Sequence, residues 1–251
     1  MDLRQTTILV TGATAGFGEA TAARFAREGA RLVVAGRRTD RLDALVRRLG
    51  VPALPLPLDV RDRKAVERAI ATLPAEFAAV DVLVNNAGLA LGLEPAHRAS
   101  LDEWEQMIDT NTRGLVVLTR LLLPGMVERG RGHVVNVGSV AGTYPYPGGN
   151  VYGATKAFVH QFSLNLRADL VGTGVRVTCV EPGMAETEFS LVRFKDPAKA
   201  AKVYEGVEPL TGADVADAIF WAVTRPPHVN VNVIEMMPEA QAFGPFAVKR
   251  R

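Results

Sequence analysis

The chain of 251 residues contains a single cysteine, Cys179, and only four histidines. One cysteine excludes an internal disulfide, which fits a reducing compartment, and we therefore expect a cytoplasmic protein. Because Cys179 lies within an apolar run, we interpret it as a small buried hydrophobic residue rather than as a nucleophile. The histidines, at positions 97, 133, 160 and 228, lack the spacing of metal ligands, so the sequence predicts no metal site.

The chain also has little excess charge of either sign and few long apolar runs. The 29 basic and 27 acidic residues give a formal net charge of +2, which provides no electrostatic reason to expect nucleic acid as a partner. The charge-free run 132–155 holds six glycines, two prolines and two asparagines, so it is not a membrane span. Asp2 and Arg4 precede an apolar stretch of strand length, and we expect no signal peptide. The basic end, residues 248–251, is interpreted as a solvated tail.

The sequence does contain a regular alternation of apolar, β-branched runs and longer segments of helical period. The runs predict strands over residues 6–11, 31–36, 53–58, 80–85, 133–139, 175–181 and 231–236. Continuous apolar strands separated by helices are typical of a parallel sheet covered on both faces. We predict an α/β fold, a Rossmann-like doubly wound sheet of about seven strands flanked by helices, in one domain over residues 1–251. The third strand is the weakest prediction, because prolines interrupt it.

Residues 186–210 depart from this alternation. The segment lacks a clean period and holds many charges. Such a segment beside a binding crevice is usually a lid, and we predict a mobile substrate lid here. A passive surface excursion is the alternative.

A glycine-rich turn directly follows the first predicted strand, with the spacing G-x-x-x-G-x-G. Glycines without Cβ atoms let a pyrophosphate approach the backbone, and the next helix directs free N–H groups and its positive dipole end at that anion. The turn therefore predicts a nucleotide site. The predicted contacts are Gly12, Ala13, Thr14, Ala15, Gly16, Phe17 and Gly18.

The residues after the second predicted strand indicate which dinucleotide fits. An NAD-specific site usually places a carboxylate there, but this chain has Arg37 and Arg38, which could pair with a 2′-phosphate. We therefore favour NADP over NAD. Alternatively, a helix begins at Thr39 or Asp40 and the arginines lie in solvent.

Two further strand ends complete the predicted cofactor site. Asp59, followed by Val60, could accept a hydrogen bond from an adenine amino group or cap the next helix. The sequence N-N-A-G, which includes Asn86, Ala87 and Gly88, allows close contact with a flat ligand. By itself it is also an ordinary turn.

Tyr152 and Lys156 lie four positions apart in a small, apolar segment of helical character. Four residues of helix turn about 400°, so both side chains leave one face. A phenol with a pKa of about 10 beside a permanent cation becomes easier to ionise. The pair could therefore transfer protons near neutral pH. A surface tyrosine beside a solvated lysine is the alternative.

Five features follow one another along the chain: T-G-x-x-x-G-x-G, N-N-A-G, Asn111, Ser139 and Y-x-x-x-K. In their order and spacing, the chain resembles the short-chain dehydrogenase/reductase family over essentially its whole length. Three longer stretches resemble one bacterial subgroup of this family, the NADP-dependent 3-hydroxy acid dehydrogenases. They are "NNAGLALGLEPAHRAS", "GGNVYGATKAFVHQFSLNLRADL" and "HVNVNVIEMMP". These enzymes oxidise serine, allo-threonine and related acids such as 3-hydroxyisobutyrate, and reduce malonic semialdehyde. The resemblance implies NADP and a small hydroxy acid or carbonyl substrate. The alternatives are a reductase for a 3-oxoacyl thioester or sugar and a non-catalytic NADP-binding regulatory protein.

The resemblance also assigns catalytic roles. Tyr152 is the general base in oxidation and the general acid in reduction. Lys156 lowers its pKa and holds the nicotinamide ribose. Ser139 donates a hydrogen bond to the reacting oxygen. Asn111, in the predicted long helix, anchors a water that links Lys156 to solvent, although a buried asparagine there could simply satisfy backbone groups.

The remaining implied roles concern the nicotinamide and the substrate. Pro182, Gly183 and Thr187 match the family's loop over the nicotinamide, where Ala185 departs from the usual valine or isoleucine. Ser139, Tyr146 and Arg193 are predicted to contact the substrate, with Arg193 binding the carboxylate. Plain solvent exposure of Arg193 is the alternative.

The segments 101–123 and 152–171 carry more apolar residues than one sheet-facing side of a helix needs. Relatives in the family pair these helices between subunits, so we expect a homotetramer. A stripe that faces only the protein's own core is the alternative.

Overall fold

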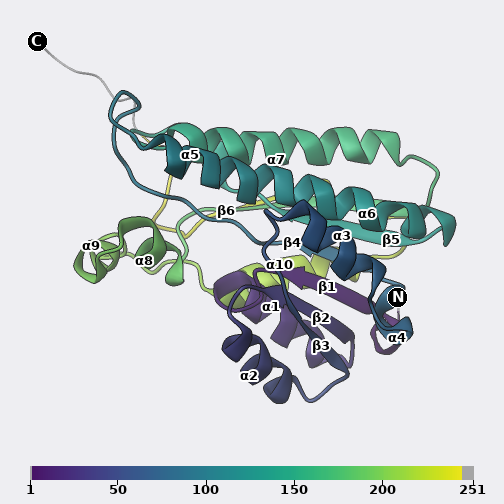
Figure 1. The fold of residues 1–251 in the computed structure, drawn as a ribbon. Coiled ribbons are helices and arrows are strands. Elements are labelled where there is room, and N and C mark those ends of the chain that lie inside the picture. The colour runs from purple at the N-terminus through teal and green to yellow at the C-terminus, as the bar shows by residue number, and fades with distance from the viewer. Residues whose placement is uncertain (1, 245–251) are drawn as a thin grey trace, which may run out of the picture.

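Seven parallel strands form one sheet in the order β3-β2-β1-β4-β5-β6-β7 in the computed structural model, which describes residues 2–244 (Figure 1). The strands are β1 (Thr7–Thr11), β2 (Arg31–Gly36), β3 (Ala53–Pro57), β4 (Val82–Asn85), β5 (Gly132–Val137), β6 (Val175–Pro182) and β7 (Val233–Met236). In the register, Leu9 of β1 lies between Val33 and Leu83. The predicted Rossmann-like α/β fold is confirmed. The basic end 248–251 lies outside the described residues.

The strand order reverses beside β1, since the chain first builds outward to β3 and then returns to place β4 on the other side. In open α/β sheets, ligands bind at the carboxyl ends of the strands next to such a reversal. The turn after β1 and the N-N-A-G turn after β4 both lie there, because β1 and β4 are parallel neighbours. The topology therefore brings together motifs that are far apart in the sequence.

Helices cover both faces of the sheet. One layer contains α1 (Gly16–Ala26), α2 (Thr39–Leu49) and α10 (Gly212–Val223). The other contains α3 (Arg63–Ala71), α4 (Ala75–Ala78), α6 (Gly114–Glu128) and α7 (Asn150–Asp169). Helix α5 (Leu101–Ile108) precedes α6, and short 3₁₀ turns lie at Leu3–Gln5 and Val140–Gly142. No helix within residues 2–244 is long and apolar enough to cross a membrane.

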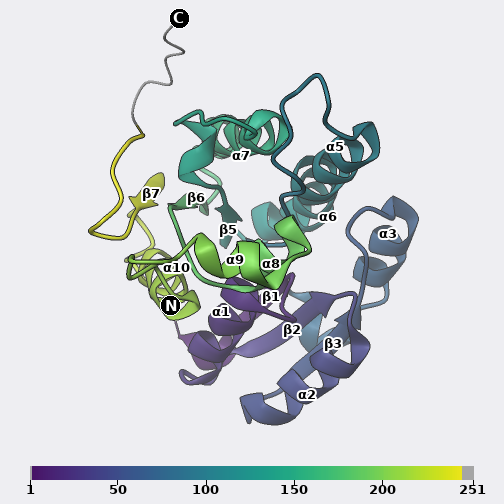
Figure 2. The same cartoon turned by 90° about the vertical axis from the view of Figure 1, so that its left-hand side faces the viewer.

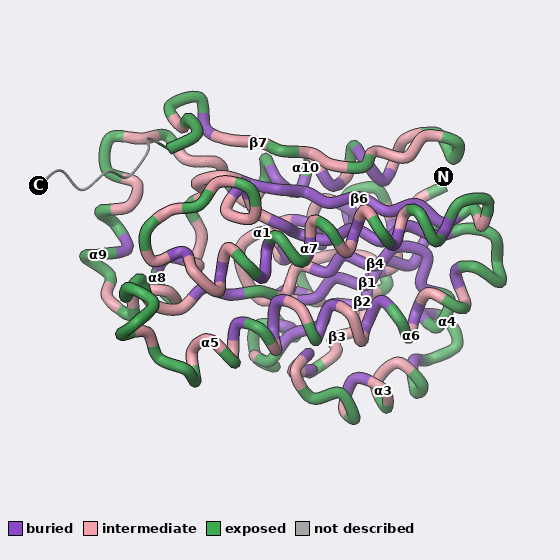
Figure 3. The backbone as a smooth tube through the Cα atoms, turned by 90° about the horizontal axis from the view of Figure 1, so that it is seen from above, coloured by how far each residue is buried: buried purple, intermediate pink, exposed green. Residues whose placement is uncertain are grey.

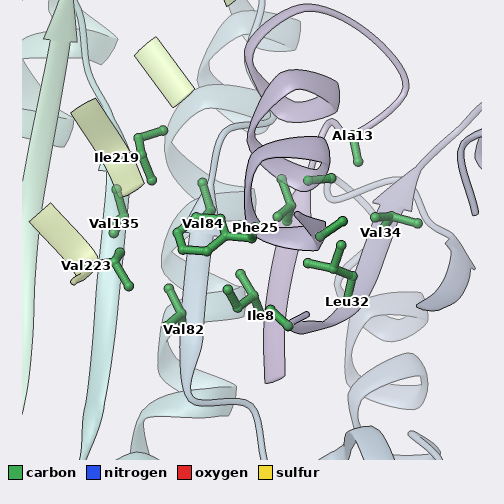
Figure 4. Close-up of a cluster of buried hydrophobic side chains, with 14 of the residues drawn as sticks. Ile8, Ala13, Phe25, Leu32, Val34, Val82, Val84, Val135, Ile219 and Val223 are labelled. Atoms are coloured by element: carbon green, nitrogen blue, oxygen red, sulfur yellow. The ribbon is translucent and has the colours of Figure 1, made fainter. Parts of the chain in front are cut away.

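The central strands are mainly apolar, because both of their faces are buried. Figure 3 shows this as buried central strands with exposed outer helix surfaces. In the cluster between the sheet and the α1–α10 layer, Phe25 of α1 packs near Ile8 and Val84 (Figure 4). The Phe25 ring also lies 5.4 Å from the Phe220 ring of α10. This packing fixes α1, and with it the glycine-rich turn, against the sheet.

The weakly predicted third strand is present at the edge of the sheet. Pro55 and Pro57 lie in β3, whose single neighbour is β2. Proline cannot donate to a strand ladder, and an edge strand tolerates this because one of its sides has no partner strand.

The predicted long helix over 101–123 is interrupted. A π-helical turn over Asp109–Arg113 joins α5 to α6, which continues to Glu128. Thr110 and Asn111 are buried in this turn, and the Thr112 hydroxyl donates to the Ile108 carbonyl at 2.5 Å. Apolar periodicity does not report such a turn, which is often found at functional sites.

The segment 186–210 contains two short helices, α8 (Glu188–Phe194) and α9 (Pro197–Lys202). Figure 2 shows both helices lying over one end of the sheet. The base of the segment is fixed by backbone bonds from Glu186 N to Leu210 O, 2.9 Å, and from Leu210 N to Met184 O, 3.0 Å. Helices of seven and six residues are too short to give the clean period that the sequence lacked.

Candidate active site

A cavity of about 760 Å³ lies at the carboxyl ends of the strands. It extends from the turn after β1, past the ends of β2, β4 and β5, to α8 and to residues 237–244. Its volume is in the range of cofactor and ligand sites. All the sequence-predicted site residues line the cavity except Ala13, Gly18 and Asn111.

The glycine-rich turn has the geometry of an anion cradle. Gly12 and Gly16 adopt left-handed φ values of +65° and +55°, which disfavour any residue with a Cβ atom. A Cβ on Gly18 would overlap the Gly12 carbonyl oxygen and Asn86 Nδ2. Helix α1 begins at this turn without a side-chain hydrogen bond from Ala15, its N-cap residue. The first amides of α1 therefore fit a phosphate group.

Ala13 and Gly18 support the glycine-rich turn but do not line the cavity. The Ala13 side chain is fully buried in the core, and its amide donates to the Ala35 carbonyl at 3.0 Å. The Ala13 side chain therefore packs in the core, and a contact between Ala13 and the cofactor stays a prediction. Gly18 permits the close packing of α1 on the turn.

Asn86 joins the two motif-bearing turns. Its Nδ2 donates to the Thr11 carbonyl at 2.8 Å, while the Thr11 hydroxyl accepts from the amide of Ala87 at 2.9 Å. Gly88 lies against the catalytic candidates, since a Cβ there would lie 3.3 Å from Asn111 Oδ1 and 3.5 Å from Lys156 Nζ. The N-N-A-G segment is therefore not an ordinary surface turn, because it is bonded to the end of β1 and lies beside Asn111 and Lys156.

Arg38 is held at the cavity wall. Its Nε donates to Thr14 Oγ1 at 3.1 Å, and its Nη1 donates to Glu188 Oε2 at 2.8 Å. Glu188 also forms an ion pair with Arg41 at 2.5 Å, and the hydrogen bonds from Arg41 and Arg38 lower the pKa of its carboxyl. Helix α2 does begin at Thr39, as in the alternative interpretation, but Arg38 is not simply in solvent.

Asp59 faces the cavity with both of its oxygens already engaged. Arg61 donates to them from Nε and Nη2, the latter at 2.6 Å, and these bonds lower the pKa of Asp59. The alternative that Asp59 caps the next helix is wrong, because Asp62 is the N-cap and accepts from the Ala65 amide at 3.0 Å. Val60 lines the cavity beside Asp59.

Tyr152 and Lys156 lie on one face of α7 and are buried, with exposed fractions of 8% and 6%. This contradicts the solvated alternative. Ser139 lies between β5 and the 3₁₀ turn, where its hydroxyl accepts from the Ala141 amide at 3.2 Å and donates to the Pro182 carbonyl at 3.4 Å. Ser139 is also close enough to Tyr152 to act on its pKa, and both residues line the cavity. The three predicted groups therefore meet in one place.

The expected net lowering of the Tyr152 pKa is wrong for this structure, because burial outweighs the effect of nearby charges. Burial raises the pKa of Tyr152 to about 12, although the hydrogen bond with Ser139 and the charge of Arg193 act to lower it. Burial also lowers the pKa of Lys156 to about 8. The Lys156 ammonium lies 5.8 Å from the centre of the Tyr152 ring and donates to the Val137 carbonyl at 2.8 Å. The loss of hydration on burial therefore changes the Tyr152 pKa more than the charge of the nearby Lys156 does.

Asn111 satisfies backbone groups through its side chain. Its Oδ1 accepts from the Leu89 amide and its Nδ2 donates to the Leu89 carbonyl, both at 2.9 Å. Nδ2 also donates to the Thr155 hydroxyl at 3.0 Å. Asn111 therefore fastens the loop after β4 to α7, next to Lys156. A role in proton exchange stays a prediction.

Arg193 of α8 reaches back into the cavity. Its Cζ lies 5.4 Å from the Tyr146 ring centre and 5.7 Å from the Tyr152 ring centre. Nε donates to the Gly92 carbonyl at 3.2 Å, whereas the buried Nη2 has no hydrogen-bond partner within residues 2–244. The neighbouring Lys195 is different, because it is exposed and pairs with Glu103 at 3.1 Å. The solvent-exposed alternative for Arg193 is therefore wrong.

The loop after β6 forms the wall opposite the glycine-rich turn. Thr187 caps α8 by accepting from the Phe189 amide at 3.1 Å, and a Cβ on Gly16 would lie 3.2 Å from it. Pro182 and Gly183 line the cavity. Ala185 is packed by a backbone bridge to Leu210 and a 2.8 Å bond from the Tyr204 hydroxyl, so the loop is held without a larger side chain.

Sequence reasoning missed three residues at this site. Glu188 bonds Arg38 and Arg41, Tyr204 supports the loop, and Gln241 Oε1 accepts from the Met184 amide at 2.6 Å. Glu188 carried one usable signal, since an acidic residue directly after an N-cap favours a helix start. Neither of the others carried a signal, because both act through long-range contacts.

Comparison with known proteins agrees with this geometry. The model of the family described as short chain dehydrogenase matches residues 6–197. The chain is 60% identical over 245 residues to the NADP-dependent 3-hydroxy acid dehydrogenase of Salmonella typhi, covering 97% of this chain and 99% of that protein. It is 52% identical over 245 residues to the serine 3-dehydrogenase of Agrobacterium fabrum, covering 97% and 98%.

A solved structure shows the same similarity. The closed form of serine dehydrogenase complexed with NADP⁺ superposes with a TM-score of 0.96 at 57% identity, covering 98% of this chain and all of that one. Family model, sequence relatives and structure all extend over most of the chain. The protein therefore belongs to the short-chain dehydrogenase family.

Proposed function

We propose that the protein is an NADP-dependent oxidoreductase that transfers a hydride between the nicotinamide and a 3-hydroxy acid of the serine, allo-threonine, 3-hydroxyisobutyrate or 3-hydroxypropionate type. The activities named for relatives at 60% and 52% identity support this assignment. One observation carries it: Arg193 Nη2 is buried beside Tyr152 and has no hydrogen-bond partner among residues 2–244, so a cation for a carboxylate lies next to the proton-transfer group.

The cavity fits NADP along its length. When bound, the nicotinamide accepts or donates the hydride. The turn after β1 offers glycine backbone and helix amides to the pyrophosphate, and the arginines after β2 offer charge to the 2′-phosphate. The proposed contacts are Gly12, Ala13, Thr14, Ala15, Gly16, Phe17, Gly18, Arg37, Arg38, Asp59, Val60, Asn86, Ala87, Gly88, Tyr152, Lys156, Pro182, Gly183 and Thr187.

The proton chemistry takes place at the substrate oxygen. In oxidation Tyr152 accepts the hydroxyl proton as the C–H bond gives up its hydride, and in reduction Tyr152 returns that proton. Ser139 donates a hydrogen bond to the same oxygen where negative charge develops. Lys156, with a pKa of about 8, is mainly cationic at neutral pH and favours the phenolate electrostatically. Asn111 would hold a water for proton exchange with solvent.

Substrate recognition rests on Arg193. A guanidinium binds a carboxylate through two parallel hydrogen bonds, and Nη2, which has no partner in the described part of the chain, can make one of them. Tyr146 packs under the guanidinium and limits its movement. This arrangement favours a small acid, whose carboxylate and reacting carbon lie a few bonds apart, over a neutral carbonyl compound.

The segment 186–210 is proposed to act as the substrate lid of a single dehydrogenase domain over residues 1–251. Its helix α8 carries Arg193 toward the substrate and Glu188 toward the arginines at the start of α2, so closing the segment would complete both ends of the site. Its base is fixed by the bonds to Leu210, which confines movement to the two helices.

We further propose a cytoplasmic homotetramer. On α5 and α7, large apolar side chains face outward: Leu101 is 65% exposed, Ile108 46% and Phe158 42%. The Phe158 ring stacks on Phe162 at 5.8 Å, which forms a flat apolar surface on α7. Pairing of such helices between subunits would cover these residues.

Turnover with a panel of substrates tests the proposed function. Serine, 3-hydroxyisobutyrate and a 3-hydroxyacyl thioester are each supplied with NADP⁺ or NAD⁺, and reduced cofactor is followed at 340 nm. We expect the two acids to be oxidised with NADP⁺ at a higher kcat/KM than the thioester. Faster turnover of the thioester would instead assign a reductase of another substrate class, and turnover of none would indicate a binding protein.

A further inference from the structure

A third polar side chain continues the catalytic stripe of α7. Tyr152, Lys156 and His160 follow one another at intervals of four residues, so they lie on one helix face. His160 Nδ1 lies 2.6 Å from Glu181 Oε1. The Glu181 side chain is only 3% exposed, whereas the His160 side chain is 33% exposed. A buried carboxylate is thus linked to the surface through a histidine.

Glu181 lies directly behind the backbone that holds Lys156. A Cβ on Gly138 would lie 2.9 Å from Glu181 Cγ and 3.3 Å from its Oε1, so the carboxylate packs against that glycine. The preceding residue, Val137, provides the carbonyl that accepts from Lys156 Nζ at 2.8 Å. The carboxylate and the ammonium therefore lie against two adjacent residues, Gly138 and Val137, where β5 ends.

The immediate partners of Glu181 carry no permanent positive charge. Cys179 donates its thiol to Oε1 at 3.4 Å, and burial raises the pKa of that thiol to about 12, so it stays neutral. His160 is the other partner, and within residues 2–244 no arginine or lysine forms an ion pair with Glu181. An uncompensated buried carboxylate is costly, and it interacts strongly with any buried cation nearby.

Two further titratable groups near Glu181 are Glu235 of β7 and Tyr144 of the loop before α7. Glu235 is the register partner of Glu181, and Tyr144 donates to Glu235 Oε1 at 3.2 Å. Burial and the charges of Glu235 and Glu181 raise the pKa of Tyr144, which therefore stays a neutral phenol. Burial lowers the pKa of Lys156, whereas Cys179 and then Glu181 act to raise it. Because the Cys179 thiol stays neutral, Glu181 is the group whose charge can support the Lys156 cation.

We propose that Glu181, oriented by His160, is a positioning residue that keeps Lys156 protonated during turnover by serving as its buried counter-charge. The inference rests on the proposed function, in which the Lys156 ammonium favours the Tyr152 phenolate. Glu181 does not touch the reacting atoms. It acts through Lys156, and His160 fixes the carboxylate while leaving its own far side to solvent.

Direct titration of Lys156 tests this inference without turnover. In protein labelled with ¹³C at the lysine Cε, the six lysines give few signals, and the spectrum of Lys156→Met identifies that of Lys156. We expect Glu181→Gln to lower the titration midpoint of Lys156 by about one pH unit, the lower end of the effect of a nearby opposite charge. Glu235→Gln is the matched control and should leave the midpoint unchanged.

The alkaline limb of kcat for serine oxidation gives the second readout. It should move to lower pH in Glu181→Gln by the same amount, and in the same direction in His160→Phe, while the KM for NADP⁺ stays within about twofold. If Glu181→Gln fails to fold, His160→Phe carries the test, because its position is partly exposed. An unchanged Lys156 midpoint in a folded variant overturns the inference. Absence of turnover in the wild type would instead overturn the proposed function.

Discussion

Substitution of Arg193 by leucine separates recognition of the carboxylate from the rest of the chemistry. Nε of Arg193 is committed to the Gly92 carbonyl, whereas Nη2 is buried with no partner within residues 2–244. A hydrogen bond to a charged group contributes about 1.5–3 kcal/mol. Loss of that contact should therefore reduce kcat/KM for 3-hydroxyisobutyrate by roughly ten- to hundredfold, since about 1.4 kcal/mol corresponds to a factor of ten.

The neutral analogue 2-methylpropane-1,3-diol provides the internal control, because it replaces the carboxylate by an alcohol and keeps the reacting carbon. Arg193 also lowers the pKa of Tyr152 by its charge, so both substrates should lose some rate in the variant. The difference between the two losses measures the carboxylate contact. Both are measured at 340 nm with saturating NADP⁺.

Lys195→Met is the matched variant on the same segment. Lys195 is exposed and paired with Glu103, so kcat/KM for the acid should change by less than about twofold. Equal losses for the acid and the diol in Arg193→Leu would refute carboxylate binding by this residue. The reasoning would also fail if Lys195→Met proved as damaging as Arg193→Leu.

Three further predictions concern the buried lysine, the cofactor end and the glycine-rich turn. Burial lowers the pKa of Lys156 from 10.5 to about 8, so the folded state binds fewer protons and this group destabilises the fold below pH 8. Lys156→Met should therefore increase the free energy of unfolding at pH 7, measured by urea denaturation, by on the order of 1–3 kcal/mol. This gain in stability should disappear between pH 8 and 10.5. A loss of stability at pH 7 would contradict the prediction. Arg38→Ser should reduce the preference for NADP⁺ over NAD⁺ in kcat/KM about tenfold or more, whereas Arg48→Ser, which removes the ion pair with Glu19, should not change it. Gly18→Ala should weaken NADPH binding measured by fluorescence, because the new Cβ overlaps the Gly12 carbonyl, and unchanged binding would show that the turn can shift.

The sequence was most informative where local patterns decide the structure. Nearly continuous apolar runs predicted all seven strands, because a sheet covered on both faces buries most of its strand positions. The prolines of β3 indicated a weak strand and fit its edge position. The motifs predicted to form the site do lie around one cavity, because parallel strands bring their carboxyl ends together. They are the glycine-rich turn, the N-N-A-G turn and the pair Tyr152 and Lys156.

Sequence reasoning failed where burial or a distant partner decides the outcome. The spacing of Tyr152 and Lys156 showed that they share a helix face, but only the fold shows that burial outweighs their mutual attraction. The bond of Arg38 to Glu188 spans 150 positions, and Asp59 is engaged by Arg61 rather than by the helix after it. The π-helical turn at Asn111 depends on hydrogen bonds to the loop after β4.

The most direct test of the account is a single-turnover measurement with Tyr152→Phe. This change removes the phenolic hydroxyl and keeps the ring that packs 5.6 Å from Phe189. We predict that NADPH binds with an affinity within about threefold of the wild type, while the rate of hydride transfer from serine to NADP⁺ falls at least about a hundredfold, the typical contribution of a general acid–base group. Hydride transfer at the wild-type rate would contradict the central claim that Tyr152 moves the substrate proton.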